Sequence, residues 1–139
     1  MSKETNRNNQ KGGNKMNKEF IPYSEALALK ELGFDEPCFG LYHNDKTFYP
    51  TQCKSHEQFH GQICSAPLYQ QAFRWFREKH NLHAIIEHDS DNYYYVLQGV
   101  KDIDFATVES NEDYEMVYLK YEEAELECLK KLIEIVKSK

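Results

Sequence analysis

Residues 66–80 read APLYQQAFRWFREKH, and this stretch decides how the rest of the chain is interpreted. At about 100° per residue, its polar side chains fall on one arc of a helix and its apolar side chains on the other. The apolar arc is formed by Leu68, Tyr69, Ala72, Phe73, Trp75 and Phe76. A stripe this wide predicts a helix that packs onto a hydrophobic core, with Ser65 as its N-cap and Pro67 in its first turn.

Two further helices are predicted on either side of this one. The first runs from Ser24 to Leu32, with Ser24 as its N-cap and Gly33 at the C′ position. The second spans residues 122–136, where one side carries Leu126, Leu129, Leu132, Ile133 and Val136. Because the apolar arc covers more than half of this helix, we expect it to be buried on two sides, against a sheet and against a helix or a second subunit.

Four β-rich segments lie between the helices and predict two hairpins. Residues 38–43 and 47–51 flank one turn, and residues 82–88 and 93–98 flank the other. In the last of these segments, alternation places Tyr93, Tyr95 and Leu97 on the face opposite Tyr94 and Val96.

The element order is therefore α-β-β-α-β-β-α, which predicts an α+β fold with about three helices and an antiparallel sheet of about four strands. We expect a single domain over residues 19–139. Residues 1–18 are rich in Asn, Lys and Gly and have almost nothing to bury, so we expect a disordered basic tail there. Met16 lies just before the first structured residues, so Met1 and Met16 are both candidates for the native start.

Charge and hydropathy exclude several classes of partner. The chain has a net charge of −6, and five Lys or Arg with one Glu in residues 1–18 leave −10 on residues 19–139. An acidic body repels phosphate backbones, so we expect no binding to duplex nucleic acid. No apolar run approaches the roughly 20 residues that span a bilayer, and no secretory signal is present, so we expect no membrane partner. These features predict a cytoplasmic protein whose four cysteines are reduced thiols.

Three blocks of the sequence resemble a family of small hypothetical proteins encoded by bacteriophages and prophages, especially those of Bacteroidetes. The blocks are FIPYSEALALKELGFDEPCFG at 20–40, APLYQQAFRWFREKHNL at 66–82 and YEEAELECLKKLIEIVK at 121–137. The resemblance implies a phage or mobile-element origin and a life in the cytoplasm of the bacterial host cell. It implies no activity, cofactor or catalytic residue.

One candidate site is a zinc site with the spacing C-x2-H-x3-H-x3-C, formed by Cys53, His56, His60 and Cys64. Thiolate and imidazole are the ligands that zinc prefers. On a continuous helix, however, this spacing lets only neighbouring ligands reach a single ion, so a second element would have to contribute, such as Cys38 or His43. The alternative, which the spacing favours, is a polar loop with scattered Cys and His residues.

A second candidate site binds a small anionic ligand, such as a nucleotide or signal molecule, through Arg74, Arg77, Tyr93 and Tyr95. Arginine pairs with phosphate, and tyrosines on a strand can stack on bases. The alternative is that the arginines form the solvated side of a helix and the tyrosines pack within the sheet.

Nothing in the sequence indicates an enzyme. It contains no G-x-G-x-x-G, P-loop, G-x-S-x-G or H-E-x-x-H pattern. His83 and Glu87 share a strand face, and Glu125 interrupts the apolar arc of the last helix, but a surface pair and a carboxylate beside basic neighbours are the simpler interpretations. We therefore expect a non-enzymatic accessory protein that binds a host or phage protein and forms a homodimer through its C-terminal helix. Ligand sequestration and a zinc-supported module are the alternatives.

Overall fold

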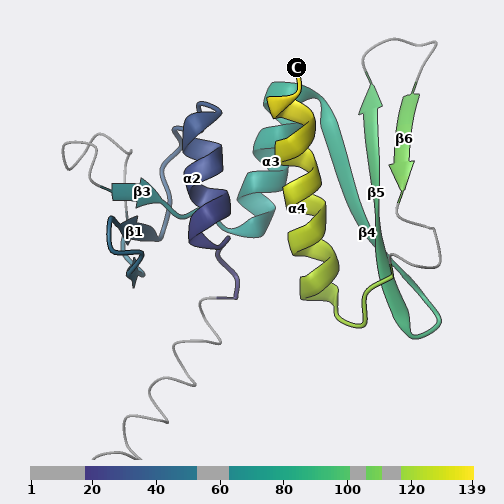
Figure 1. The fold of residues 1–139 in the computed structure, drawn as a ribbon, viewed down its shortest axis with the longest axis horizontal. Coiled ribbons are helices and arrows are strands. Elements are labelled where there is room, and N and C mark those ends of the chain that lie inside the picture. Colours follow the sequence, from purple (N-terminus) through teal and green to yellow (C-terminus); the bar gives the residue numbers. More distant parts are fainter. Residues whose placement is uncertain (1–17, 53–62, 101–105, 111–116) are drawn as a thin grey trace, which may run out of the picture. The chain divides into compact units, whose positions relative to one another are not determined.

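The structure, a computed structural model, describes residues 18–52, 63–100, 106–110 and 117–139. These residues contain three α-helices and two three-stranded antiparallel sheets (Figure 1). The chain divides into two compact units, Met1–Tyr69 and Gln70–Lys139. The α+β class, the three helices and the two hairpins are confirmed, and a third strand joins each hairpin. The expected disordered tail lies almost wholly outside the described residues, and the single domain over residues 19–139 stays a prediction.

The N-terminal unit consists of one helix and a small sheet. Helix α2 spans Tyr23–Glu31, and the sheet has the order β2-β1-β3, with β1 at Leu41–His43, β2 at Phe48–Tyr49 and β3 at Ile63–Ser65. The central strand β1 pairs antiparallel with both of its neighbours. The core of this unit contains several deeply buried side chains, namely Ile21, Leu29, Phe34 and Cys38.

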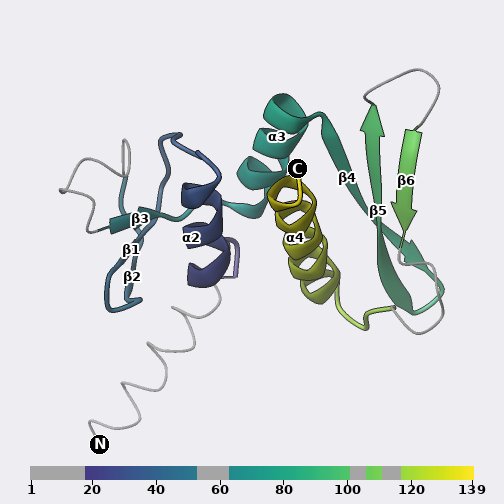
Figure 2. The ribbon, with the colours of Figure 1, turned by 45° about the horizontal axis from the view of Figure 1, so that its top comes forward.

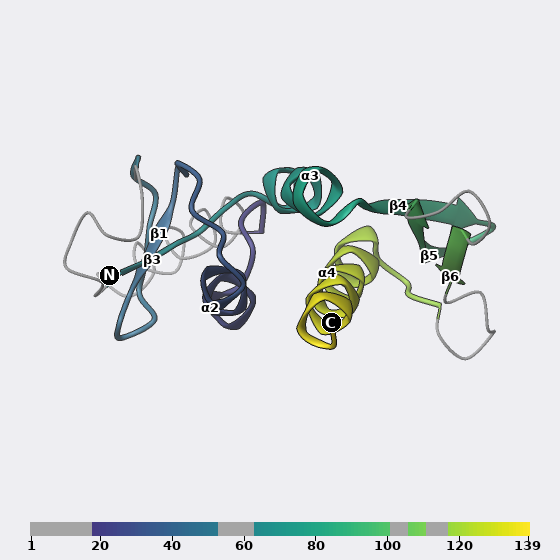
Figure 3. The same cartoon turned by 90° about the horizontal axis from the view of Figure 1, so that it is seen from above.

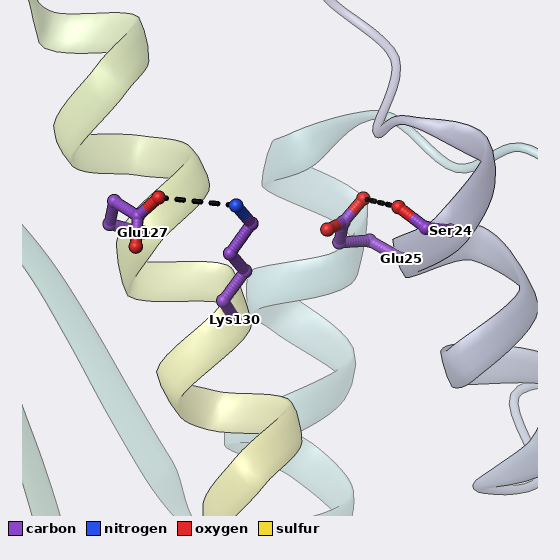
Figure 4. A network of polar contacts seen from close by, with 4 residues as sticks. All are labelled: Ser24, Glu25, Glu127 and Lys130. Carbon is purple, nitrogen blue, oxygen red and sulfur yellow. Dashed lines mark hydrogen bonds and ion pairs between the residues drawn. The ribbon is translucent and has the colours of Figure 1, made fainter.

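The structure differs from the prediction at the N-terminal end of α2 and agrees with it at the C-terminal end. Ser24 as N-cap is wrong: the N-cap residue is Pro22, and no side chain caps the helix. Because the helix begins at Tyr23, Ser24 lies inside the first turn, where its Oγ donates to Oε2 of Glu25 over 2.6 Å (Figure 4). Gly33 at the C′ position is confirmed, since its φ of +100° is one that a residue with a Cβ adopts only with strain.

Helix α3 spans Tyr69–His80 and begins later than predicted. Ser65 as its N-cap is wrong, because Ser65 belongs to β3. Pro67 precedes the helix, and its carbonyl accepts a hydrogen bond of 3.0 Å from the N–H of Ile21. This extended pairing satisfies the backbone before the helix starts. The predicted apolar face is confirmed by burial of Ala72, Trp75 and Phe76.

The C-terminal unit contains α3, a sheet of order β4-β5-β6, and α4. The elements are β4 at Leu82–Asp89, β5 at Asn92–Val100, β6 at Ala106–Ser110 and α4 at Tyr121–Lys137. Helix α4 lies against β4 and β5 (Figures 2 and 3). It buries one side completely, at Ala124, Cys128, Leu129 and Leu132. None of the helices in the described ranges is both long and apolar enough to cross a membrane.

Candidate functional site

The sheet of the C-terminal unit has two faces with different surroundings. Alternate residues of a strand point to opposite faces, so Tyr93, Tyr95 and Leu97 of β5 share one of them. Leu97 is 2% exposed, and the ring of Tyr93 meets that of Tyr121 in α4 edge-on, with centroids 5.9 Å apart. This inner face is therefore the one that α4 covers, and the predicted alternation along β5 is confirmed.

The opposite face of the sheet is extended by the residues just before α4. Tyr118 pairs with Tyr93 through two backbone hydrogen bonds of 2.8 and 2.9 Å, on the edge of β5 away from β4. Because Tyr118 lies directly opposite Tyr93, its two neighbours point to the other face. We call this surface the outer face and define it by Ile85, Tyr94, Val117 and Leu119. Val96 also points to this side but is only 8% exposed.

The outer face leaves large apolar side chains in contact with water. Leu119 is 77% exposed, Ile85 43% and Val117 39%. Tyr94 lies between β4 and the segment of Val117, and its hydroxyl donates a hydrogen bond to Oε2 of Glu87. The centre of this face is therefore apolar and aromatic, with a carboxylate beside it.

Acidic residues border the outer face. Exposed carboxylates lie at the end of the β4–β5 hairpin and in the first turn of α4, namely Glu87, Asp89, Asp91, Glu122 and Glu123. A surface with this charge attracts basic partners and repels acidic ones.

The residues of the predicted anion site lie on two elements of the C-terminal unit. Arg74 and Arg77 are exposed and lie about one turn apart on α3. Tyr95 is only 8% exposed on the inner face, and the ring of Tyr93 is packed against His88, with centroids 4.8 Å apart. The two tyrosines therefore serve as packing groups of the inner face, while their role in ligand binding stays a prediction.

Three of the four predicted zinc ligands, Cys53, His56 and His60, lie outside the described residues. Cys64 is buried in β3, where its thiol lies 3.6 Å from the carbonyl oxygen of Ser65. Within the ranges that the structure describes, no three Cys, His, Asp or Glu side chains gather as metal ligands would. The zinc site stays a prediction.

Tyr42 lies opposite Cys64 in the N-terminal sheet and is a buried hydrogen-bond donor. Its hydroxyl donates to the carbonyl oxygen of Ile21 over 2.8 Å. Burial, and then the neighbouring Cys64 and Glu25, raise the pKa of Tyr42 to about 12. The hydroxyl therefore remains protonated at neutral pH and fixes the sheet to the segment before α2.

His80 ends α3 in an apolar environment. Its ring lies edge-on to Trp75, with centroids 4.9 Å apart, and in the described part of the chain its buried Nε2 has no hydrogen-bond partner. Burial, and then the charge of Lys139, lower the pKa of His80. A neutral imidazole packed in this way contributes to the core of the unit.

The outer face was not among the candidate sites predicted from the sequence. The alternation along β4 already placed Ile85 beside Glu87, but the strand-like pairing of Tyr118 depends on a contact distant in sequence. The signal that could have indicated it is the Val-Tyr-Leu segment at 117–119, which alternates just before the acidic first turn of the last helix.

Comparison of the chain with protein-family models, curated proteins and solved structures finds no match.

Proposed function

We propose that the protein is a non-enzymatic accessory protein of phage origin that binds a basic protein of the host or phage through the outer face. The observation that carries this proposal is the exposure of Leu119, Ile85 and Val117 on one face of the sheet. Contiguous apolar side chains in water are unfavourable, and in soluble proteins they commonly mark interaction sites.

The chemistry of the border supports a basic partner. Protein interfaces typically have an apolar, aromatic centre and a polar rim, and the outer face has both. Its rim is acidic, so a partner with Lys or Arg around an apolar centre has complementary charge. Such a complex should weaken as salt is raised, because the rim charges remain in contact with solvent.

The test is capture of a partner from bacterial extract by the full chain and by matched variants. Leu119→Arg places a positive charge on the outer face, where it opposes a basic partner. Phe39→Arg is the control, because Phe39 is 66% exposed but belongs to the N-terminal unit. We expect a basic protein that the parent and the control retain and that Leu119→Arg loses by at least about tenfold in affinity, equivalent to about 1.4 kcal/mol, because the new charge repels a basic partner. A partner retained equally by all three proteins would refute the outer face as its binding site.

A further inference from the structure

Strand β4 is an edge strand, because among the described strands it pairs only with β5. It is eight residues long and contains neither Pro nor Lys, two residues that commonly protect an edge from pairing with another chain. Ile85, near its middle, is 43% exposed. An edge of this length and composition can accept another strand.

The pairing with β5 shows which backbone groups of β4 point away from the sheet. In an antiparallel pair, every second residue directs both of its backbone groups at the neighbouring strand, and the residues between direct theirs away. Tyr93 uses both groups to bond Tyr118, so they point away from β4. His88 lies opposite Tyr93 and therefore directs its own groups outward. Counting by two, the outward set of β4 is Leu82, Ala84, Ile86 and His88.

Two copies of β4 related by a twofold axis would run antiparallel, and their outward residues would have to lie opposite one another. The register with Ile85 on the axis achieves this over nearly the whole strand. It sets Ala84 opposite the partner's Ile86, and Leu82 opposite the partner's His88. The backbone groups on both free edges are then satisfied.

The same register brings complementary side chains together on the outer face. Ile85 meets the partner's Ile85 on the axis, and on each side of it His83 meets the partner's Glu87. Apolar pairs and pairs of a basic with an acidic side chain are favourable across strands. Moving the axis to Ala84 or Ile86 would instead set the exposed Ile85 against the partner's His83 or the partner's Glu87.

We propose that the protein forms a homodimer by antiparallel pairing of two β4 strands, with Ile85 on the twofold axis. A second copy is the occupant that this edge fits, because this register pairs Ile85 with Ile85 and His83 with Glu87. The register centred on Ile86 also pairs His83 with an acidic residue, Asp89, but it sets the apolar Ile85 against Glu87. Helix α4 offers less surface to a second subunit, since Cys128, Leu129 and Leu132 are 0% exposed within one chain.

Charge-swap variants of the full chain test the pairing, with the dimer dissociation constant measured by sedimentation velocity. His83→Glu sets two acidic residues opposite one another, and Glu87→Lys sets a lysine opposite a histidine. We expect either change to raise the dissociation constant about tenfold, equivalent to about 1.4 kcal/mol, because each acts twice in a symmetric dimer. The double variant H83E/E87K restores unlike charges and should return the constant to within about threefold of the parent value.

Recovery in the double variant reports contact between chains, because residues 83 and 87 lie about 13 Å apart along one strand. Ala84→Pro is a second test, because it removes an outward N–H but leaves the hydrogen bonds to β5. We expect circular dichroism to show a folded chain and sedimentation velocity to show a monomer. Phe39→Arg is the matched control, because Phe39 is exposed in the N-terminal unit and should leave the dissociation constant unchanged.

Three results would overturn the proposal: a parent protein that stays monomeric at every concentration, a dimer that His83→Glu and Ala84→Pro leave intact, or a double variant that fails to recover. None of these results would contradict the proposed binding of a basic partner by the outer face. That proposal is tested separately, by comparing Leu119→Arg with the parent in the capture assay, and one copy of the chain is enough for it.

Discussion

Leu129→Ala tests whether α4 closes the core of the C-terminal unit. Leu129 is 0% exposed, and alanine removes three of its four side-chain carbons. At about 0.8 kcal/mol for each buried carbon, the lost transfer free energy is about 2.4 kcal/mol, and an incompletely collapsed cavity raises the total to about 3–4 kcal/mol. A loss of this size is a large part of the 5–15 kcal/mol that typically separates folded from unfolded protein.

The assay is urea unfolding followed by the fluorescence of Trp75. The sequence contains a single tryptophan, and Trp75 lies in α3, so its emission reports on the C-terminal unit. Leu126→Ala is the matched control, because Leu126 is on the same helix but is only half-buried, and we expect it to cost about 1 kcal/mol. If the two variants differ by less than about 0.5 kcal/mol, the reasoning that Leu129 lies in a close-packed core is wrong.

Three further predictions follow from the buried titratable groups. The pKa of His80 is lowered in the folded chain, so the unfolded chain binds the proton more readily. The free energy of unfolding should therefore fall as the pH drops below about 6.5. In urea titrations at pH 7.5 and pH 5.5, His80→Phe should reduce that fall. Tyr42→Phe removes the hydrogen bond to Ile21 and leaves a buried carbonyl unsatisfied, so it should cost about 1–2 kcal/mol in the free energy of unfolding, and the ultraviolet titration of the parent should show one tyrosine ionising near pH 12 that the variant lacks. Burial raises the pKa of Cys128 to about 12, so its thiol should react with iodoacetamide only after unfolding, as mass spectrometry of the alkylated peptide would show; rapid labelling in the folded protein would contradict its place in the core.

The parts of the fold that the sequence predicted correctly are those that depend on local periodicity. The stripe on α4 and the alternation along β5 each repeat over several residues, so a single packing surface explains all of them. The two N-caps, Ser24 and Ser65, were predicted wrongly because a cap is decided by one residue. Ser65 has the chemistry of an N-cap, but the pairing of β3 with β1, some twenty residues earlier, takes it into a strand.

The candidate surface was harder to predict than the elements that form it. The alternation of Val117 and Leu119 about Tyr118 indicates a strand-like segment. It does not show that Tyr118 pairs with Tyr93, because that bridge joins residues on either side of the acidic stretch between β5 and α4. Exposure is also a property of the packed unit: Ile85 and Ile86 are chemically alike, yet Ile85 is exposed and Ile86 is half-buried because they point to opposite faces of one strand. A sequence pattern shows which residues share a face of the sheet, while tertiary packing decides which of the two faces is covered.

The two proposed surfaces are connected through Ile85, which belongs to the outer face and to the edge of β4. A twofold axis normal to the sheet would place the outer faces of both copies on the same side, so the dimer would present two adjacent apolar surfaces with acidic borders. A partner with two basic sites would then bind the second site at a high effective concentration, and its affinity would exceed that of a single site without any new contact. Linkage requires the reverse as well: such a partner must strengthen the dimer by the same factor, so His83→Glu should weaken capture of a two-site partner yet leave a one-site partner unaffected.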